Sequence, residues 1–329
     1  MLFQNAKHPL EMKVTHLNKV KAQRKQQLQL QMVNDKGLIS LISRAFTDLT
    51  KKETTKKTSK FGLFKNKAAN KNCFVLDFHG DIKATEVQQL REEISTLLTV
   101  AKPEDEVIVR LESSGGMVHA YGLAAAQLAR IKEAGLNLTV CIDKVAASGG
   151  YMMACVADKI LAAPFAVVGS IGVVAQVPNF HDLLEKHDID VEVFTAGKYK
   201  RTVTVFGENT EEDKQKFQQE LEETHKLFKD FVHKYRPSLD VEQVATGEHW
   251  YGEDAITRNL VDALQTSDSY ILEKMTDSEL YAIQSRQKPT IAQKLGISQA
   301  AQAVVATAID KLPDALAKLE SAKMPMVKK

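Results

Sequence analysis

The stretch DKVAASGGYMM, residues 143–153, decides the fold of this chain. Before it, residues 138–142 (LTVCI) have the apolar, β-branched pattern of a buried strand, and residues 151–156 have the unbroken apolar pattern of a helix start. Ser148 therefore lies where a strand passes into a helix, between two alanines and two glycines. The first amides of such a helix lack intrahelical partners and can face an anion. Ser148 is either a reactive hydroxyl beside that anion pocket or an ordinary helix N-cap.

A second turn of the same kind lies earlier in the chain. Residues 107–111 (VIVRL) predict a strand, residues 118–132 predict a helix, and ESSGGM at 112–117 joins them. Turns from two neighbouring parallel strands can direct N–H groups at one point, as an oxyanion hole requires. A third segment, GKYKR at 197–201, follows a predicted strand at 191–194. A lysine packed near an apolar turn can lose its proton and act as a base.

These motifs resemble those of the SppA/SohB-type serine peptidases, bacterial membrane proteases that use a Ser–Lys dyad. The resemblance rests on VAASGGYMMACVADKI, LESSGG, VGSIGVV and AGKYKRT, covers about residues 74–262, and is strongest to the SohB branch. It implies a ClpP/crotonase-like α/β fold of repeated β-α units. The expected domains are a basic N-terminal extension and linker at 1–72, the peptidase domain at 73–265 and a helical C-terminal tail at 266–329.

The resemblance also implies the site residues, position by position. Ser148 matches the nucleophile and Lys200 the general base, whereas Lys198 falls where the motif tolerates other residues. Ser170 matches a hydroxyl that orients the lysine amine. We expect Lys200 to be buried without a neighbouring carboxylate, because burial favours the free amine that a base requires. Its expected apolar neighbours include Val168, Ile171 and Tyr199. The turns of the oxyanion hole match Gly115, Gly116 and Gly149.

The implied function is that of a serine endopeptidase that cleaves membrane-associated or unfolded peptides, such as cleaved signal peptides, without a metal or cofactor. Two other classes share features with it: a crotonase-type acyl-CoA enzyme, which has a double oxyanion hole but needs no serine, and a non-catalytic membrane scaffold. The serine–lysine spacing favours the peptidase. His119, after the first glycine turn, is either a catalytic group or a surface or wall residue, and His181 lies outside any glycine-rich turn. The side chains that either wall an apolar substrate pocket or fill the core are Met117, Val118, Met152 and Met153.

Charge is distributed unevenly along the 329 residues, although the net charge is only +2. Residues 1–72 hold 16 Lys/Arg and 4 Asp/Glu, and the remainder holds 28 and 38. Residues 50–72 have the composition of a flexible linker, and the lack of a base-reading module disfavours nucleic-acid binding. An amphipathic patch at 38–46 could contact either an anionic membrane or protein.

The family implies the bacterial inner membrane and a homo-oligomer in which one chain completes its neighbour's site. SohB-type proteins usually begin with a transmembrane helix and a basic, Gln-rich segment. The resemblance implies that this sequence starts just after that helix, either because the given start is late or because this version lacks the anchor. No window of it approaches the 18 apolar residues of a membrane helix. The three cysteines lack metal spacing and are expected to be small buried hydrophobes. Further strands are predicted at 74–78 and 159–163, and further helices at 11–31, 84–100, 210–236 and 291–319.

Overall fold

The computed structural model describes residues 10–32 and 71–287. The predicted patch at 38–46, almost all of the linker and the predicted helix at 291–319 lie outside the described residues. Residues 12–285 form one compact unit, and the second unit comprises residues 1–11 and 286–329.

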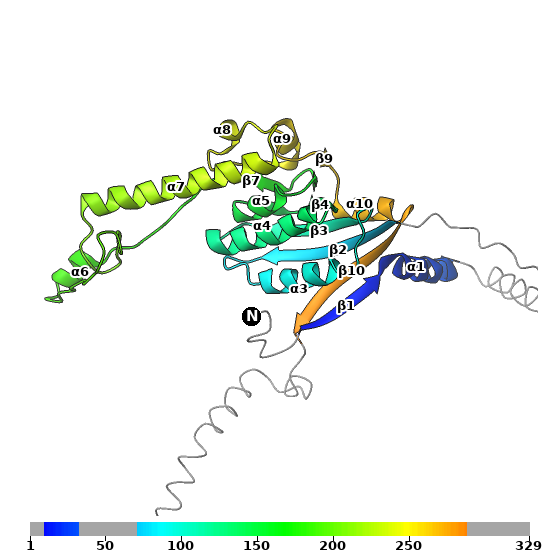
Figure 1. Ribbon diagram of the computed structural model, residues 1–329, viewed down its shortest axis with the longest axis horizontal. Coiled ribbons are helices and arrows are strands. Elements are labelled where there is room, and N and C mark those ends of the chain that lie inside the picture. Colours follow the sequence, from blue (N-terminus) through cyan, green and yellow to red (C-terminus); the bar gives the residue numbers. More distant parts are fainter. Residues whose placement is uncertain (1–9, 33–70, 288–329) are drawn as a thin grey trace, which may run out of the picture. The chain divides into compact units, whose positions relative to one another are not determined.

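A large sheet runs through the unit of residues 12–285, and its central strands are parallel (Figure 1). Within the described residues it has ten strands, seven of them in the order β1-β10-β2-β3-β4-β6-β9. The short strand β5 pairs with β3 and β7, and β7 pairs antiparallel with β8. The strands are β1 (Leu10–His16), β2 (Lys71–Gly80), β3 (Glu106–Ser113), β4 (Asn137–Ile142), β5 (Val145–Ala147), β6 (Lys159–Ala162), β7 (Val167–Gly169), β8 (His249–Tyr251), β9 (Ala263–Leu264) and β10 (Ser278–Gln287).

Helices connect the parallel strands and cover the sheet, as repeated β-α units require. The main core lies between one sheet face and α3, α4 and α5, with the last turns of α7 packed on it. A smaller core joins α10 to the opposite sheet face, around Ile108 and Cys141. The helices are α1 (Leu17–Met32), α3 (Val87–Leu97), α4 (Val118–Glu133), α5 (Gly149–Ala154), α6 (His181–Glu185), α7 (Glu211–Tyr235), α8 (Val241–Val244), α9 (Gly252–Thr257) and α10 (Ser267–Lys274).

The predicted α/β architecture is confirmed, and most predicted elements lie within a few residues of the observed ones. At Thr210, the side chain accepts from the Asp213 N–H and the Asp213 carboxylate accepts in return, a capping box that begins α7. Asn259 has φ 60°, a left-handed conformation that asparagine tolerates better than most residues with a side chain. The three cysteines are buried and free, as predicted.

Two predicted elements were wrong. Residues 191–194 form no strand, because they pair with no neighbouring strand and Phe194 is 87% exposed. The predicted helix at 11–31 begins only at Leu17, because the alternating sequence LEMKVTH before it forms β1 at the sheet edge. The sheet also extends beyond residue 265, since β10 pairs in parallel with β2. In the described ranges, no helix is long and apolar enough to cross a bilayer.

Candidate active site

Ser148 lies at the junction of β5 and α5 in a strained backbone conformation. Its φ is 52° and its ψ is −119°, which is uncommon for a residue with a side chain and costs about 1–3 kcal/mol. Two hydrogen bonds hold it there: its N–H donates to the Gly169 carbonyl at 2.8 Å, and its carbonyl accepts from the Met152 N–H at 2.9 Å. The side chain makes no capping hydrogen bond to α5. Ser148 is therefore not an ordinary N-cap.

A narrow pocket lies at Ser148. Its free volume of about 10 Å³ is near the minimum that holds one water. Of the side chains predicted to wall an apolar pocket, Val118 and Met152 line it, whereas Met153 is buried in the core and Met117 does not line it. The contribution of α7 to this pocket, through Thr224 and Phe228, was not predicted from the sequence. The lining residues are Gly116, Val118, Ser148, Gly149, Met152, Gly172, Val173, Thr224 and Phe228.

The two predicted glycine turns meet at this pocket. In the first turn, Gly115 donates its N–H to the Ser113 hydroxyl at 3.1 Å, and Met117 donates to the Ile82 carbonyl at 2.9 Å. The N–H of Gly116, between them, has no partner among the described residues, and the same holds for Gly149. Two unpaired amides from separate turns thus border the pocket that holds the serine. This is the set of donors that an oxyanion hole needs.

Parallel pairing brings the turns together. The register places Ser113 of β3 beside Ala146 of β5, so the chain leaves both strands at the same sheet edge. The contact there is so close that a methyl group added at Gly115 would lie 2.7 Å from the Gly149 nitrogen and 2.8 Å from the Ser148 Cβ. Gly115 also has φ +89°. Glycine is therefore required at this position by both backbone conformation and space.

Ser170 also lies next to the serine turn. The register pairs Ala147 of β5 with Gly169 of β7, so Ser148 and Ser170 follow adjacent strand positions. Ser170 has φ 52°, and its N–H donates to the Glu248 carbonyl at 2.6 Å. Of the predicted site residues, Ser148, Ser170 and the three glycines are thus brought together by the fold.

Lys200 is not brought to Ser148 within one chain. It is exposed and does not line the pocket. Lys198, two residues earlier, pairs with Glu212 at 2.9 Å. Glu212 lies in the first turn of α7, about 18 Å along that helix from Thr224 in the pocket wall, at 1.5 Å per residue. Figure 1 shows α7 running past α5 toward the segment that carries α6.

The expected surroundings of Lys200 are accordingly not formed by this chain alone. In the described part of the chain, Lys200 makes no ion pair and its amine makes no hydrogen bond to Ser170. Of its expected apolar neighbours, Val168 and Ile171 are buried in the body, but Tyr199 is half exposed. The physical reason is that residues 174–209 leave the body and pack against the start of α7, where solvent surrounds them.

The other candidate bases are placed unfavourably. The hydrogen bond from Lys198 to the Glu212 carboxylate raises the pKa of the lysine, which keeps it an ammonium ion at neutral pH. His119 lies exposed in the first turn of α4 and does not line the pocket, which favours the interpretation as a surface residue. His181 begins α6, in the segment that leaves the body.

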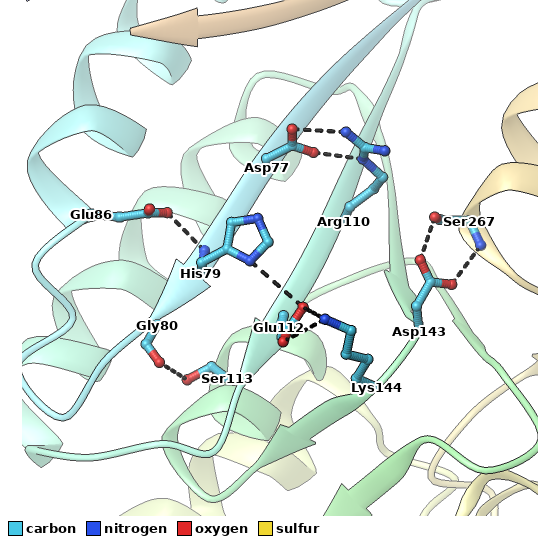
Figure 2. Close-up of polar contacts among 10 residues, drawn as sticks. All are labelled: Asp77, His79, Gly80, Glu86, Arg110, Glu112, Ser113, Asp143, Lys144 and Ser267. Atoms are coloured by element: carbon cyan, nitrogen blue, oxygen red, sulfur yellow. Dashed lines mark hydrogen bonds and ion pairs between the residues drawn. The ribbon is translucent and has the colours of Figure 1, made fainter. Parts of the chain in front are cut away.

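A second, charged pocket lies at the carboxyl ends of β2 and β3, on the sheet face opposite Ser113 (Figure 2). Arg110 donates to both oxygens of Asp77, at 2.6 and 2.8 Å, and Lys144 donates to both oxygens of Glu112. Asp143 accepts two hydrogen bonds from the first residue of α10. Because each carboxylate is paired, this cluster is explained by strand and helix pairing rather than by a ligand.

The sheet of repeated β-α units has the predicted α/β architecture, and it carries a serine and two free amides at adjoining strand ends. The profile of Peptidase family S49 matches residues 130–281, and that of Peptidase family S49 N-terminal matches residues 2–128. The chain belongs to peptidase family S49.

Relatives and a solved structure show how far the similarity extends. The chain is 65% identical over 223 residues to Probable protease SohB of Haemophilus influenzae, which covers 68% of this chain and 63% of that protein. It is 55% identical over 227 residues to Probable protease SohB of Buchnera aphidicola subsp. Schlechtendalia chinensis, which covers 68% and 74%. The solved structure of a mutant of the 1510-N membrane-bound stomatin-specific protease superimposes on this chain with a TM-score of 0.42 and 12% sequence identity. The superposition covers 65% of this chain and 98% of the protease chain.

Proposed function

We propose that this protein is a serine endopeptidase with Ser148 as nucleophile and Lys200 as general base. The observation that carries the proposal is the strained Ser148, which forms no cap and shares its pocket with the unpaired amides of Gly116 and Gly149. A crotonase-type enzyme needs the two amides but not the serine, and a scaffold needs neither. Strain held at one serine beside two free donors is the pattern of an active site.

The chemistry follows from these groups. The Ser148 Oγ attacks the carbonyl carbon of the scissile peptide bond, and its proton passes to the Lys200 amine. The carbonyl oxygen becomes an oxyanion and accepts hydrogen bonds from the Gly116 and Gly149 amides. When the carbon–nitrogen bond breaks, the leaving amine takes the proton from Lys200. A water then releases the acyl group from Ser148 by the same steps. Gly115 contributes by allowing the turns to touch.

We further propose that Lys200 reaches the serine of a second copy of the chain in a homo-oligomer. Support comes from the segment that holds Lys200, which exposes Val174 at 91% and Phe194 at 87%, together with half-exposed Tyr199. A surface of this kind is typical of a protein interface. Packing against a second copy would bury Lys200 and would place Ser170 as the hydroxyl partner of its amine. The base then becomes available only in the assembly.

The test of this function combines labelling with subunit mixing. A fluorophosphonate should modify Ser148 in the wild-type protein, and Ser148→Ala should abolish both labelling and peptide cleavage. Lys200→Ala should abolish turnover, whereas Lys198→Ala should retain most of it. Mixed Ser148→Ala and Lys200→Ala chains should recover about one quarter of wild-type turnover if each site takes its lysine from a neighbour. A wild-type protein that the reagent does not label would contradict the peptidase assignment. An active monomer by sedimentation would contradict the shared site.

We propose that the substrates are unfolded or membrane-associated peptides with apolar residues near the scissile bond. The apolar part of the Ser148 pocket, Val118, Met152 and Phe228, supports this preference. Membrane association is supported by α1, which carries four Lys/Arg and no acidic residue. A peptide library should favour apolar residues next to the cleaved bond, and the protein should bind vesicles that contain anionic lipid more tightly than neutral ones. Preference for charged peptides, or equal vesicle binding, would refute the respective proposal.

A further inference from the structure

A buried serine–tyrosine pair lies directly behind the two glycine turns, and the catalytic steps above do not use it. Ser113 ends β3 and is 2% exposed, and Tyr121 lies in the first turns of α4 and is fully buried. Their hydroxyl oxygens are 2.5 Å apart. The register between β2 and β3 sets Ser113 beside Gly80, where Figure 2 shows its hydroxyl directed at the Gly80 carbonyl.

The hydrogen bonds of this pair run in one direction. Tyr121 has one hydroxyl proton, and it donates that proton to the Asp81 carbonyl at 2.7 Å. The Ser113 hydroxyl must therefore donate its single proton to the phenol oxygen at 2.5 Å, and its longer contact with the Gly80 carbonyl, at 3.4 Å, is then without that proton. A lone pair of Ser113 remains for the Gly115 N–H at 3.1 Å. The result is a continuous chain from the first glycine turn through Ser113 and Tyr121 to the loop after β2. Burial raises the pKa of Tyr121 and so preserves its hydroxyl proton.

The tyrosine also touches the second turn. A methyl group at Gly149 would overlap the Tyr121 side chain, most closely at the ring carbon Cγ, so Gly149 lies directly against this tyrosine. The same loop after β2 holds the other side of the first turn, where Ile82 accepts from the Met117 N–H. Gly116 thus lies between Gly115, which is held by Ser113, and Met117, which is held by the loop after β2. Tyr121 is hydrogen-bonded to both Ser113 and that loop. One residue, Tyr121, contacts the supports of both unpaired amides.

We propose that Tyr121 and Ser113 are positioning residues that set the spacing of the Gly116 and Gly149 amides for the oxyanion. This inference rests on the proposed peptidase function and deepens it. An oxyanion hole stabilises charge only when its donors lie about 2.7–3.1 Å from the oxyanion, so a small displacement of one turn weakens catalysis. A purely structural role would instead lower stability and leave the bound transition state unaffected.

The test replaces Tyr121 with phenylalanine, which keeps the ring against Gly149 and removes the hydroxyl. We expect kcat to fall by about 10- to 100-fold with KM changed less than about twofold, since a lost or misplaced oxyanion donor acts on the transition state. A peptide aldehyde that adds to Ser148 should bind more weakly by the same factor, whereas the matching peptide alcohol should bind as before. Tyr270→Phe is the matched control, because Tyr270 lies in α10 and its hydroxyl donates to the Glu106 carboxylate at 2.7 Å. This control should keep kcat.

The outcomes separate this inference from the function on which it rests. Wild-type protein that a fluorophosphonate does not label at Ser148 would overturn the peptidase assignment. Labelled wild type together with a Tyr121→Phe variant of unchanged kcat and aldehyde affinity would overturn the positioning role alone. If Tyr121→Phe does not fold, Ser113→Ala takes its place, because it removes the acceptor of the Gly115 N–H. A double variant that loses no more than either single variant would show that the pair acts as one unit.

Discussion

A methyl group added at Gly115 would fall where the two glycine turns touch, so Gly115→Ala tests the architecture of the site. The backbone at φ +89° lies outside the favoured regions of alanine, which costs about 1–2 kcal/mol. The new Cβ would lie 2.7–2.8 Å from the Gly149 nitrogen, the Ala147 carbonyl oxygen and the Ser148 Cβ, none of which can rotate away. Overpacking of this kind costs about 1–3 kcal/mol more.

The expected total loss is therefore about 2–5 kcal/mol of unfolding free energy, or roughly 5–20 °C in Tm. Relief of the overlap must move Gly149, whose amide is a proposed oxyanion donor. We expect kcat to fall by about 10²–10³-fold, the effect of losing one such donor. The assay is hydrolysis of a fluorogenic peptide well below the Tm, with the folded fraction measured by circular dichroism.

Gly135→Ala is the matched control. Gly135 has a similar φ of +77°, but a methyl group there would meet no atom within 4 Å. The Gly135→Ala variant should lose about 1–2 kcal/mol of unfolding free energy and keep full peptidase activity. If Gly115→Ala were no less stable than Gly135→Ala and equally active, the close approach of the two turns would be wrong.

Three further predictions concern stability. Gly122→Ala, inside α4 and with open space at its Cβ, should raise the free energy of unfolding by about 0.5–1 kcal/mol in urea titration. Arg236→Met removes the two guanidinium hydrogen bonds to the Asp262 carboxylate, at a site where Arg236 is 8% exposed. The free energy of unfolding should fall by about 3–5 kcal/mol. A fall of less than about 1 kcal/mol would contradict this prediction. Burial raises the pKa of Glu93, so the native state holds its proton more tightly than the unfolded chain does. Its stabilisation is complete below the ordinary pKa of 4.5 and falls as pH rises through the raised value, so Glu93→Gln should gain stability over wild type as pH rises above about 4.5. Parallel pH profiles of the two proteins would refute this.

Local patterns were enough to predict the strand-to-helix turns. The β-branched runs at 107–111 and 138–142, each followed by small residues and a helix, placed the glycine turns and Ser148 at one sheet edge, and the structure confirms that they meet there. A strand that ends in glycines before a helix is defined by consecutive residues, so its signal is present in the sequence itself. The capping box at Thr210 is another such local signal.

Tertiary structure alone decided three features. The strand predicted at 191–194 is absent because a strand requires a partner, which a sequence pattern does not supply. The network of Ser113 and Tyr121 joins residues that look like an ordinary turn serine and a core helix residue, and only their packing gives the direction of the hydrogen bonds. The position of Lys200 was also undetermined, because 52 residues separate it from Ser148 and their distance depends on where α7 carries the intervening segment. Sequence determines what is local, whereas contacts between distant segments depend on how the whole chain packs.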